Sequence, residues 1–241
     1  MKAFSIKGLS KSFKGVEAVR GLTLALDRGE VLGFIGTNGA GKTTTIKMLL
    51  GLTPPTSGTL EVLGGSPADP EVRRHIGFMP ETANYYPYLN AWELLAFYGG
   101  LCGMDPKLVR SRSEMLLEEV ELIKAAKRPL KTYSKGMLQR AGLAQALLAD
   151  PELLILDEPF TGLDPLARIR FRNLVKRLKG EGKSIFFSSH ELGETELLCD
   201  RVAIIKEGHC FYDGPVSCIA GDGRENLERL FLDVLEKGVV A

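Results

Sequence analysis

The chain has 241 residues, of which 44% are hydrophobic, and its 31 lysine and arginine residues nearly balance its 30 acidic residues. This length suits one α/β domain with a helical insertion, and the balanced charge argues against a nucleic-acid-binding groove. No apolar run approaches the roughly 20 residues of a membrane-spanning helix, and the first residues lack the apolar region of a signal peptide. We therefore expect a cytoplasmic chain that binds no nucleic acid.

The N-terminal part of the sequence predicts two kinds of strand. Strand-like segments at residues 4–7, 22–26 and 59–63 suggest an antiparallel β layer. The wholly apolar run at residues 31–35 predicts a buried strand, and residues 44–50 predict a helix with one apolar side. The sequence thus predicts an antiparallel layer beside an α/β core.

A glycine-rich loop joins this buried strand to the helix. Residues 36–43 read Gly-Thr-Asn-Gly-Ala-Gly-Lys-Thr and fit G-x-x-x-x-G-K-[ST], the phosphate-binding loop. Glycines let successive backbone N–H groups point at phosphate oxygens, and the helix N-terminus adds its positive dipole end. The lysine then reaches the β- and γ-phosphates, while the first threonine hydroxyl ligands Mg²⁺. The candidate nucleotide-binding residues are Asn38, Gly39, Ala40, Gly41, Lys42, Thr43 and Thr44.

Residues 82–149 contain mainly helical patterns and predict a helical subdomain. Asp105-Pro106 is a helix-start signal, and Leu116, Val120 and Ile123 then recur at helical spacing. We expect one helix to carry these three apolar residues.

An apolar strand ends in two carboxylates at residues 153–158. The run Leu-Leu-Ile-Leu predicts a central parallel strand that is buried on both faces, and its carboxyl end should lie beside the phosphate loop. Asp157 is positioned to hold Mg²⁺, and Glu158 to accept a proton from an attacking water. The pair therefore indicates nucleoside triphosphate hydrolysis.

The last third of the chain predicts two more strands, a hairpin and a terminal helix. Residues 184–187 form an apolar strand before Ser-Ser-His at 188–190, and the run at 202–205 predicts a strand that turns back into residues 210–212. The tail at residues 224–237 has an amphipathic pattern with balanced charge on its polar face. We expect it to pack on its own domain and not on a membrane.

The four cysteines, Cys102, Cys199, Cys210 and Cys218, include no C-x-x-C pair and have no histidines at metal-binding spacing. We expect reduced thiols, most of them serving as small core residues.

The order of these motifs resembles the ATP-binding subunits of ABC transporters over about residues 4–214. The phosphate loop is followed by a signature segment at residues 133–137, the carboxylate strand, Gly-Leu-Asp at residues 162–164 and a switch histidine. The resemblance implies a P-loop NTPase core with antiparallel β and helical subdomains. It makes residues 1–220 the ATP-binding domain, with the helical subdomain at about 82–149, and residues 221–241 a C-terminal helix. It assigns Ser134 and Gly136 to the partner chain's ATP, Asp164 to communication across the dimer, and His190 to catalysis.

Three positions depart from the usual family residues. The signature reads Tyr-Ser-Lys-Gly-Met in place of Leu-Ser-Gly-Gly-Gln, a variant that resembles bacterial exporter ATPases. Glu81 stands where glutamine is usual and can also offer oxygen to Mg²⁺ or water. Phe13 corresponds to the aromatic residue that stacks on adenine, although it could instead be a core residue of the first hairpin, and Val16 is expected to pack on the same base.

The aromatic cluster after Glu81 comprises Tyr85, Tyr86, Tyr88 and Trp92. Its position matches the family's contact with permease helices, and large aromatic residues are frequent interface anchors. The alternative is that the cluster fills the core of the helical subdomain. The tyrosines are the better contact candidates, because Trp92 lies at a helix start.

The resemblance implies an ATPase that uses ATP and Mg²⁺ and powers a membrane permease made of separate chains. Two such subunits, identical or different, close around two ATP molecules on the inner face of the cell membrane. Export is favoured over import, and the substrate is not legible from the sequence. Two other classes are a soluble ABC-type ATPase in DNA repair or translation and a GTPase switch. The first usually carries a zinc insert, a coiled coil or two ATPase halves, and the second an Asn-Lys-x-Asp motif, none of which is found.

Overall fold

Two sheets form the framework of the protein. The computed structural model describes residues 1–82, 84–221 and 226–237, so parts of the predicted C-terminal segment lie outside the described residues. The smaller sheet is antiparallel, with strand order β2-β1-β4, as predicted for the N-terminal segments. Its strands are β1 (Lys2–Phe13), β2 (Val16–Asp27) and β4 (Ser57–Val62).

The larger sheet has six strands in the order β5-β6-β7-β3-β8-β9. All neighbouring pairs are parallel except the β8–β9 hairpin, which turns through Glu207 and Gly208 at positive φ values of 48° and 85°. The strands are β3 (Val31–Gly36), β5 (Ile76–Met79), β6 (Leu153–Asp157), β7 (Ser184–Ser189), β8 (Arg201–Lys206) and β9 (His209–Pro215). Every residue of β3, β6 and β7 is buried, as expected for parallel strands covered on both faces. The prediction of a parallel core is confirmed.

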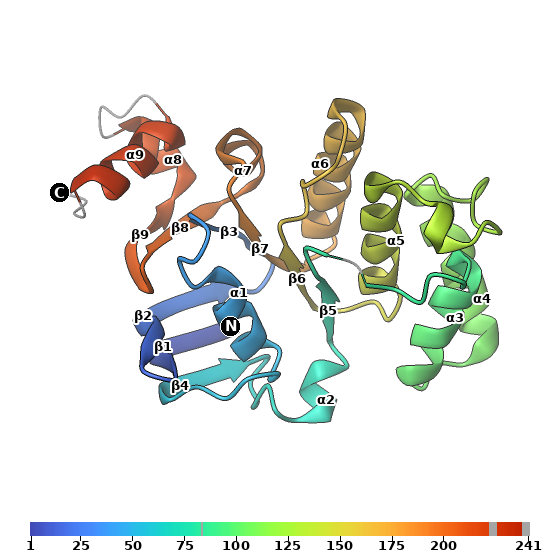
Figure 1. Ribbon diagram of the computed structural model, residues 1–241, viewed down its shortest axis with the longest axis horizontal. Helices are drawn as coiled ribbons and strands as arrows, with labels where there is room; N and C mark the ends of the chain where they lie inside the picture. Colours follow the sequence, from blue (N-terminus) through green and yellow to red (C-terminus); the bar gives the residue numbers. More distant parts are fainter. Residues whose placement is uncertain (83, 222–225, 238–241) are drawn as a thin grey trace.

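Helices cover both faces of the larger sheet (Figure 1). The helices before and after the helical lobe are α1 (Lys42–Leu49), α2 (Pro70–Arg73), α6 (Pro165–Gly180) and α7 (Leu192–Leu198), and α2 has no buried residue. Near α1, apolar residues of both sheets share one hydrophobic core, and α6 packs in a second core that extends to the helical lobe. These two cores lie on opposite faces of the larger sheet, because alternate residues of β6 belong to each of them.

The helical lobe comprises α3 (Ala91–Leu101), α4 (Pro106–Glu119), the short 3-10 helix η1 (Leu130–Thr132) and α5 (Lys135–Leu147). A side chain caps the N-terminus of each of these α-helices. Asn90 and Glu93 form a reciprocal capping box on α3, and Asp105 accepts from two backbone N–H groups of α4, as its Asp-Pro signal predicts. The lobe lies at the opposite end of the molecule from the C-terminal helices (Figure 1).

The prediction that Leu116, Val120 and Ile123 share one helix is wrong at its end. Helix α4 stops at Glu119, and Glu121 adopts a left-handed φ of 54°. The Glu121 and Leu122 N–H groups donate to the carbonyls of Glu118 and Leu117 at 2.9 and 2.8 Å, which is the Schellman pattern. The turn buries Leu122 completely, and the spacing of apolar residues alone does not predict this burial.

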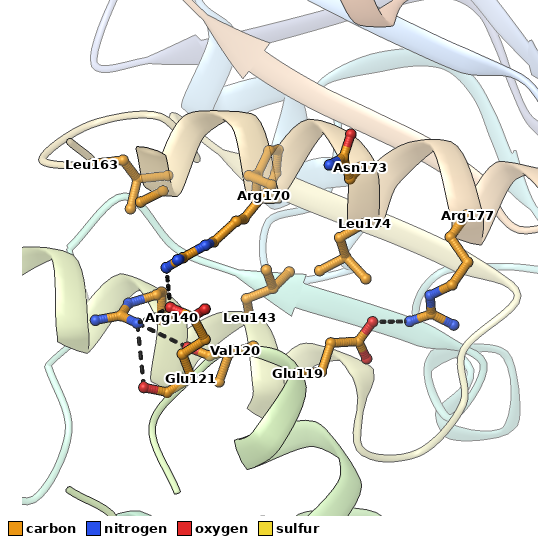
Figure 2. Close-up of a pocket in the computed structure, with 12 residues that line it drawn as sticks. Glu119, Val120, Glu121, Arg140, Leu143, Leu163, Arg170, Asn173, Leu174 and Arg177 are labelled. Carbon is orange, nitrogen blue, oxygen red and sulfur yellow. Dashed lines mark hydrogen bonds and ion pairs between the residues drawn. The ribbon is translucent and has the colours of Figure 1, made fainter. Parts of the chain in front are cut away.

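Ion pairs join the helical lobe to α6 across a cavity of about 330 Å³ (Figure 2). Arg170 and Arg177 of α6 pair with Glu121 and Glu119 of the lobe, and Arg140 of α5 lies 3.9 Å from the Glu121 carboxylate. Both glutamates follow or end α4, so the end of this helix is held against the core.

The C-terminal segment forms α8 (Val216–Gly221) and α9 (Leu227–Lys237). Leu227, Leu230 and Val234 of α9 are fully buried and pack in one cluster with Ile204 of β8. This face of α9 therefore contacts the larger sheet's own residues.

The prediction that most cysteines are core residues is wrong. Cys102 and Cys218 are exposed, whereas Cys199 and Cys210 are partly buried, and all four are free thiols. Burial raises the pKa of both inner thiols, that of Cys210 to about 11. Cys102 follows the last residue of α3 and Cys218 lies in the short α8, and both side chains face outward from these helices.

Candidate functional site

The strand order brings three sequence-distant segments to one edge of the larger sheet. Because β6, β7 and β3 are parallel neighbours, their carboxyl ends lie side by side. Asp157 ends β6 and Glu158 follows it, Ser188 lies at the end of β7 with His190 just beyond, and the glycine-rich loop follows β3. The edge thus combines an anion-binding loop with acidic and basic side chains.

The glycine-rich loop needs its glycines for both conformation and space. Gly39 and Gly41 have φ values of 80° and 109°, and a Cβ on Gly41 would lie 2.5 Å from the Ala18 carbonyl oxygen. Helix α1 begins at Lys42, which leaves its first N–H groups without intrahelical acceptors. Ala40 is buried and accepts a hydrogen bond from Gly208, which fixes the loop to the β8–β9 hairpin.

Lys42 is buried at the centre of the cleft. Its ammonium donates to the Gly36 carbonyl at 2.7 Å and the Thr37 carbonyl at 3.3 Å, and it lies 3.4 Å from Glu158 Oε1. A lysine is rarely buried without partners, and these three oxygens compensate for the loss of water around its ammonium group. They hold one positive charge between the loop and the carboxylate strand.

Asp157 is the centre of a chain of hydroxyl contacts. Thr43 Oγ1 donates to one carboxylate oxygen at 3.2 Å, and the Ser188 hydroxyl donates to the other at 2.5 Å. Ser188 also accepts the Glu158 N–H at 3.0 Å. The Thr43 and Asp157 groups are hard oxygen donors of the kind that Mg²⁺ prefers, so this donor set fits that ion.

Glu158 has a strained backbone and a buried carboxylate. Its φ is 50°, and its side chain is 7% exposed. The carboxylate accepts the His190 backbone N–H at 3.3 Å, and its Oε2 lies 2.7 Å from His190 Nδ1. The strained turn aims Glu158 at Lys42 and His190 together.

These groups line one cleft of about 370 Å³. Glu81 reaches this cleft from the end of β5 and is exposed there, and Thr161 and Ala18 complete its wall. The residues that line the cleft are Ala18, Thr37, Asn38, Gly39, Gly41, Lys42, Thr43, Thr44, Glu81, Asp157, Glu158, Thr161 and His190. Most of the predicted phosphate and metal residues therefore meet in one place. The cavity in Figure 2 shares none of these residues.

Besides the buried Ala40, two groups of predicted residues lie outside this lining. Phe13 and Val16 flank the β1–β2 turn and are 47% and 70% exposed, so neither is a core residue of the hairpin. Ser134 caps α5 by accepting the Met137 N–H at 3.3 Å, and Asp164 caps α6 by accepting the Ala167 N–H at 2.8 Å. A Cβ on Gly136 would lie 2.9 Å from the Gly162 carbonyl oxygen, so the signature and the aspartate loop pack directly together.

Comparison with known proteins decides the family. A family model described as ABC transporter matches residues 19–161, which is more than half of the chain. The chain belongs to the ABC transporter ATP-binding family. The matched range contains the glycine-rich loop, the signature segment and the carboxylate strand.

Relatives in this family are similar over most of the chain. An ABC transporter ATP-binding protein of Nostoc sp. is 43% identical over 208 residues, which are 86% of this chain and 62% of the relative. The Nod factor export ATP-binding protein I of Ralstonia nicotianae is 37% identical, over 87% of this chain and 66% of the relative. The chain thus spans about three fifths to two thirds of the length of these two relatives.

Solved structures show the same fold. The ATP-binding subunit of an ABC transporter superposes with a TM-score of 0.89 at 32% identity, and the match covers 97% of this chain and all of that one. A dimeric ATP-binding cassette in a post-hydrolysis state with ADP and Pi has a TM-score of 0.82 at 24% identity. The P-loop NTPase architecture with an antiparallel sheet and a helical lobe is confirmed.

The family site contains contacts that sequence reasoning did not single out. Ser188 is fully buried at the end of an apolar strand. A polar residue in such a buried run was the feature of the sequence that could have indicated a functional contact. Gln139 of α5 donates from Nε2 to the carbonyls of Glu81 and Thr161 at 3.1 and 3.4 Å. This amide links the helical lobe to two walls of the cleft, and nothing in the sequence pattern marks it.

Proposed function

We propose that this chain binds and hydrolyses ATP to power a membrane permease built from other chains. The observation that carries the proposal is the meeting of Lys42, Thr43, Asp157, Glu158 and His190 in one cleft beside the phosphate loop. Family membership supports ATP as the nucleotide. The cleft contains the lysine ammonium, the carboxylates and the backbone N–H groups that phosphoryl transfer to water requires.

Glu158 is the general base in this proposal. Its carboxylate accepts a proton as water attacks the γ-phosphorus, a new P–O bond forms, and the bond to the β–γ bridging oxygen breaks to release ADP. Lys42 stabilises charge on the β- and γ-phosphates. His190 holds Glu158 through the 2.7 Å contact and lines the same cleft.

Mg²⁺ is the proposed metal cofactor. Thr43 and Asp157 would hold it, and Glu81 lies in the same lining as a further oxygen donor. When bound, Mg²⁺ neutralises phosphate charge and polarises the transferred phosphoryl group. Asn38, Gly39, Ala40, Gly41 and Thr44 would bind the phosphates, with Phe13 stacking on adenine beside Val16.

A second ATP-binding subunit, identical or different, would complete the site. Ser134, Gly136 and Asp164 lie outside the cleft lining of their own chain, and Ser134 and Asp164 are exposed. Ser134 also begins a helix, where backbone N–H groups are available to an anion. These observations support contact of Ser134 and Gly136 with ATP bound to the facing subunit, and communication through Asp164.

The permease would dock on exposed aromatic residues after Glu81. Tyr86 and Tyr88 are 64% and 78% exposed, and the Tyr86 ring packs edge-on against Phe97 at 5.7 Å. Tyr85 differs, because it packs against the core of the helical lobe and burial raises its pKa. The aromatic cluster is thus divided between core and surface, and we assign docking to Tyr86 and Tyr88.

We further propose export as the direction, supported by the Tyr-Ser-Lys-Gly-Met signature and by a relative named for Nod factor export. Among the described residues no helix is long and apolar enough to cross a bilayer. We place the subunit in the cytoplasm against the inner membrane face. Residues 1–220 would form the ATP-binding domain, with its helical subdomain at about 82–149, and α9 (Leu227–Lys237) of the C-terminal segment would pack on it.

The test is nucleotide binding and turnover by Lys42→Ala beside the wild type. We expect ATP hydrolysis to fall at least about a hundredfold, because alanine removes the positive charge that would stabilise the phosphates. Lys47→Ala is the matched control, since Lys47 is exposed on the same helix. Full ATP turnover by folded Lys42→Ala would refute the phosphate-loop assignment, and a preference for GTP would refute ATP as the nucleotide.

A further inference from the structure

One guanidinium joins the aspartate loop to the switch segment. Arg168, in the first turns of α6, donates from both terminal nitrogens to the two carboxylate oxygens of Glu191, at 3.0 and 2.8 Å. Its Nε also lies 3.4 Å from the Leu163 carbonyl oxygen. A single side chain thus contacts two loops that are 28 residues apart in the sequence.

Each end of this contact is next to a proposed functional residue. Leu163 directly precedes Asp164, the helix cap that would communicate with the partner subunit. Glu191 directly follows His190, whose ring lies 2.7 Å from the general base Glu158. The Glu191 N–H also donates to the Ser189 hydroxyl at 2.9 Å, so the short segment carrying His190 is held on both sides.

We propose that Arg168 is a positioning residue that couples the aspartate loop to the placement of His190 against Glu158. This inference rests on the proposed ATP hydrolysis. Movement of the aspartate loop by an approaching partner subunit would shift the guanidinium, and Glu191 and His190 would move with it. Arg168 itself is not among the residues that line the cleft.

The geometry favours arginine specifically. Two parallel N–H···O bonds to one carboxylate fix direction as well as distance, while the third nitrogen remains available for the Leu163 carbonyl. Both side chains are partly buried, at 28% and 31% exposure, so the pair is shielded more than a surface ion pair. Lysine offers a single charged nitrogen and cannot hold both loops in this way.

The next turn of the same helices provides a matched control. Arg172 of α6 lies 3.5 Å from Glu194 of α7, and both side chains are partly buried. This pair joins α6 to α7 as the first one does, but it contacts neither the aspartate loop nor the residue after His190. Its loss measures the general cost of breaking an α6–α7 ion pair.

The experiment compares wild type, Arg168→Met, Arg168→Lys and Arg172→Met as full chains. We expect Arg168→Met to lower kcat for ATP about tenfold with KM and ATP affinity within about twofold, because it misplaces a catalytic group without removing it. Arg168→Lys should recover only part of the rate. Arg172→Met should stay within about twofold of wild type at a similar melting temperature. The exchange Arg168→Glu with Glu191→Arg should recover more activity than either single change.

A spectroscopic measurement keeps the test independent of turnover. The chain has three histidines, so the ring signals of His190 can be assigned by NMR with the variant His190→Gln. We expect Arg168→Met to move the His190 ring nitrogen and Cε1 signals and leave those of His75 and His209 in place, while Arg172→Met moves none of them.

Unchanged His190 signals, or equal kinetic losses in Arg168→Met and Arg172→Met, would overturn the coupling. A parallel fall in melting temperature, ATP affinity and kcat would show a merely structural role and would also overturn it. Failure of the proposed function gives a different result, namely no ATP hydrolysis by the wild type, and the NMR comparison still decides the role of Arg168.

Discussion

Replacing Glu158 with glutamine tests the proposed chemistry most directly. The substitution keeps the size of a side chain that is 7% exposed and keeps an oxygen that can accept from His190. It removes the basic carboxylate and the 3.4 Å ion pair with Lys42. Lys42 retains its hydrogen bonds to the Gly36 and Thr37 carbonyls, so we expect the fold and the phosphate loop to persist.

The expected loss follows from the role of the group. Removal of a positioned general base costs about 100-fold or more in rate, which corresponds to about 2.7 kcal/mol of transition-state stabilisation. ATP affinity should stay within a few-fold of wild type, because Lys42 and the loop N–H groups are intact. The lost negative charge should also favour the closed ATP-bound dimer, so light scattering should detect more ATP-dependent dimer than for wild type.

The assay is steady-state phosphate release, combined with ATP binding and light scattering on the same preparation. Glu61→Gln is the matched control, since it neutralises an exposed carboxylate that does not line the cleft. We expect this control to stay within a few-fold of wild type. Normal turnover by Glu158→Gln would show that Glu158 is not the base, and equal losses in both variants would show an effect of net charge alone.

Two further predictions concern the surface. Tyr86→Ala and Tyr88→Ala should reduce co-purification with membranes while ATP binding and melting temperature stay near wild type, because both rings are largely exposed; unchanged co-purification of both stable variants would contradict the docking surface. At pH 8, Cys102 and Cys218 should react with a thiol reagent far faster than Cys210. The raised pKa of about 11 leaves only about a thousandth of the Cys210 thiol as thiolate, and its reactivity should rise as pH approaches 11, which peptide mapping would check.

Local sequence patterns predicted much of the fold, because strand burial, left-handed turns and helix starts each depend on a few neighbouring residues. The apolar runs that end at Ile35 and Leu156 could only be buried strands, and the glycines at 39 and 41 were needed for a left-handed backbone. Asp105 marked a helix start through its own hydrogen bonds to the backbone. Each of these signals depends on neighbours within a few residues.

Exposure of the aromatic and cysteine residues was decided by packing between distant segments. Tyr85 and Tyr86 are adjacent and chemically identical, yet one enters the core of the helical lobe and the other faces solvent. The same holds for the end of α4, where burial of Leu122 overrides helical spacing. No local pattern carries this information, because it depends on which helices arrive from elsewhere.

The sequence by itself predicted the chemistry proposed for this protein, since the phosphate loop and the carboxylate pair have local signatures and the family resemblance marked the histidine. Only the tertiary structure decided how they are connected. The strand order β6-β7-β3 places Ser188 between Asp157 and the backbone of Glu158, and the packing of α6 beside α7 lets Arg168 bind Glu191. These contacts join residues far apart in the chain, and they form only when parallel strands and their covering helices fix the distance between their ends.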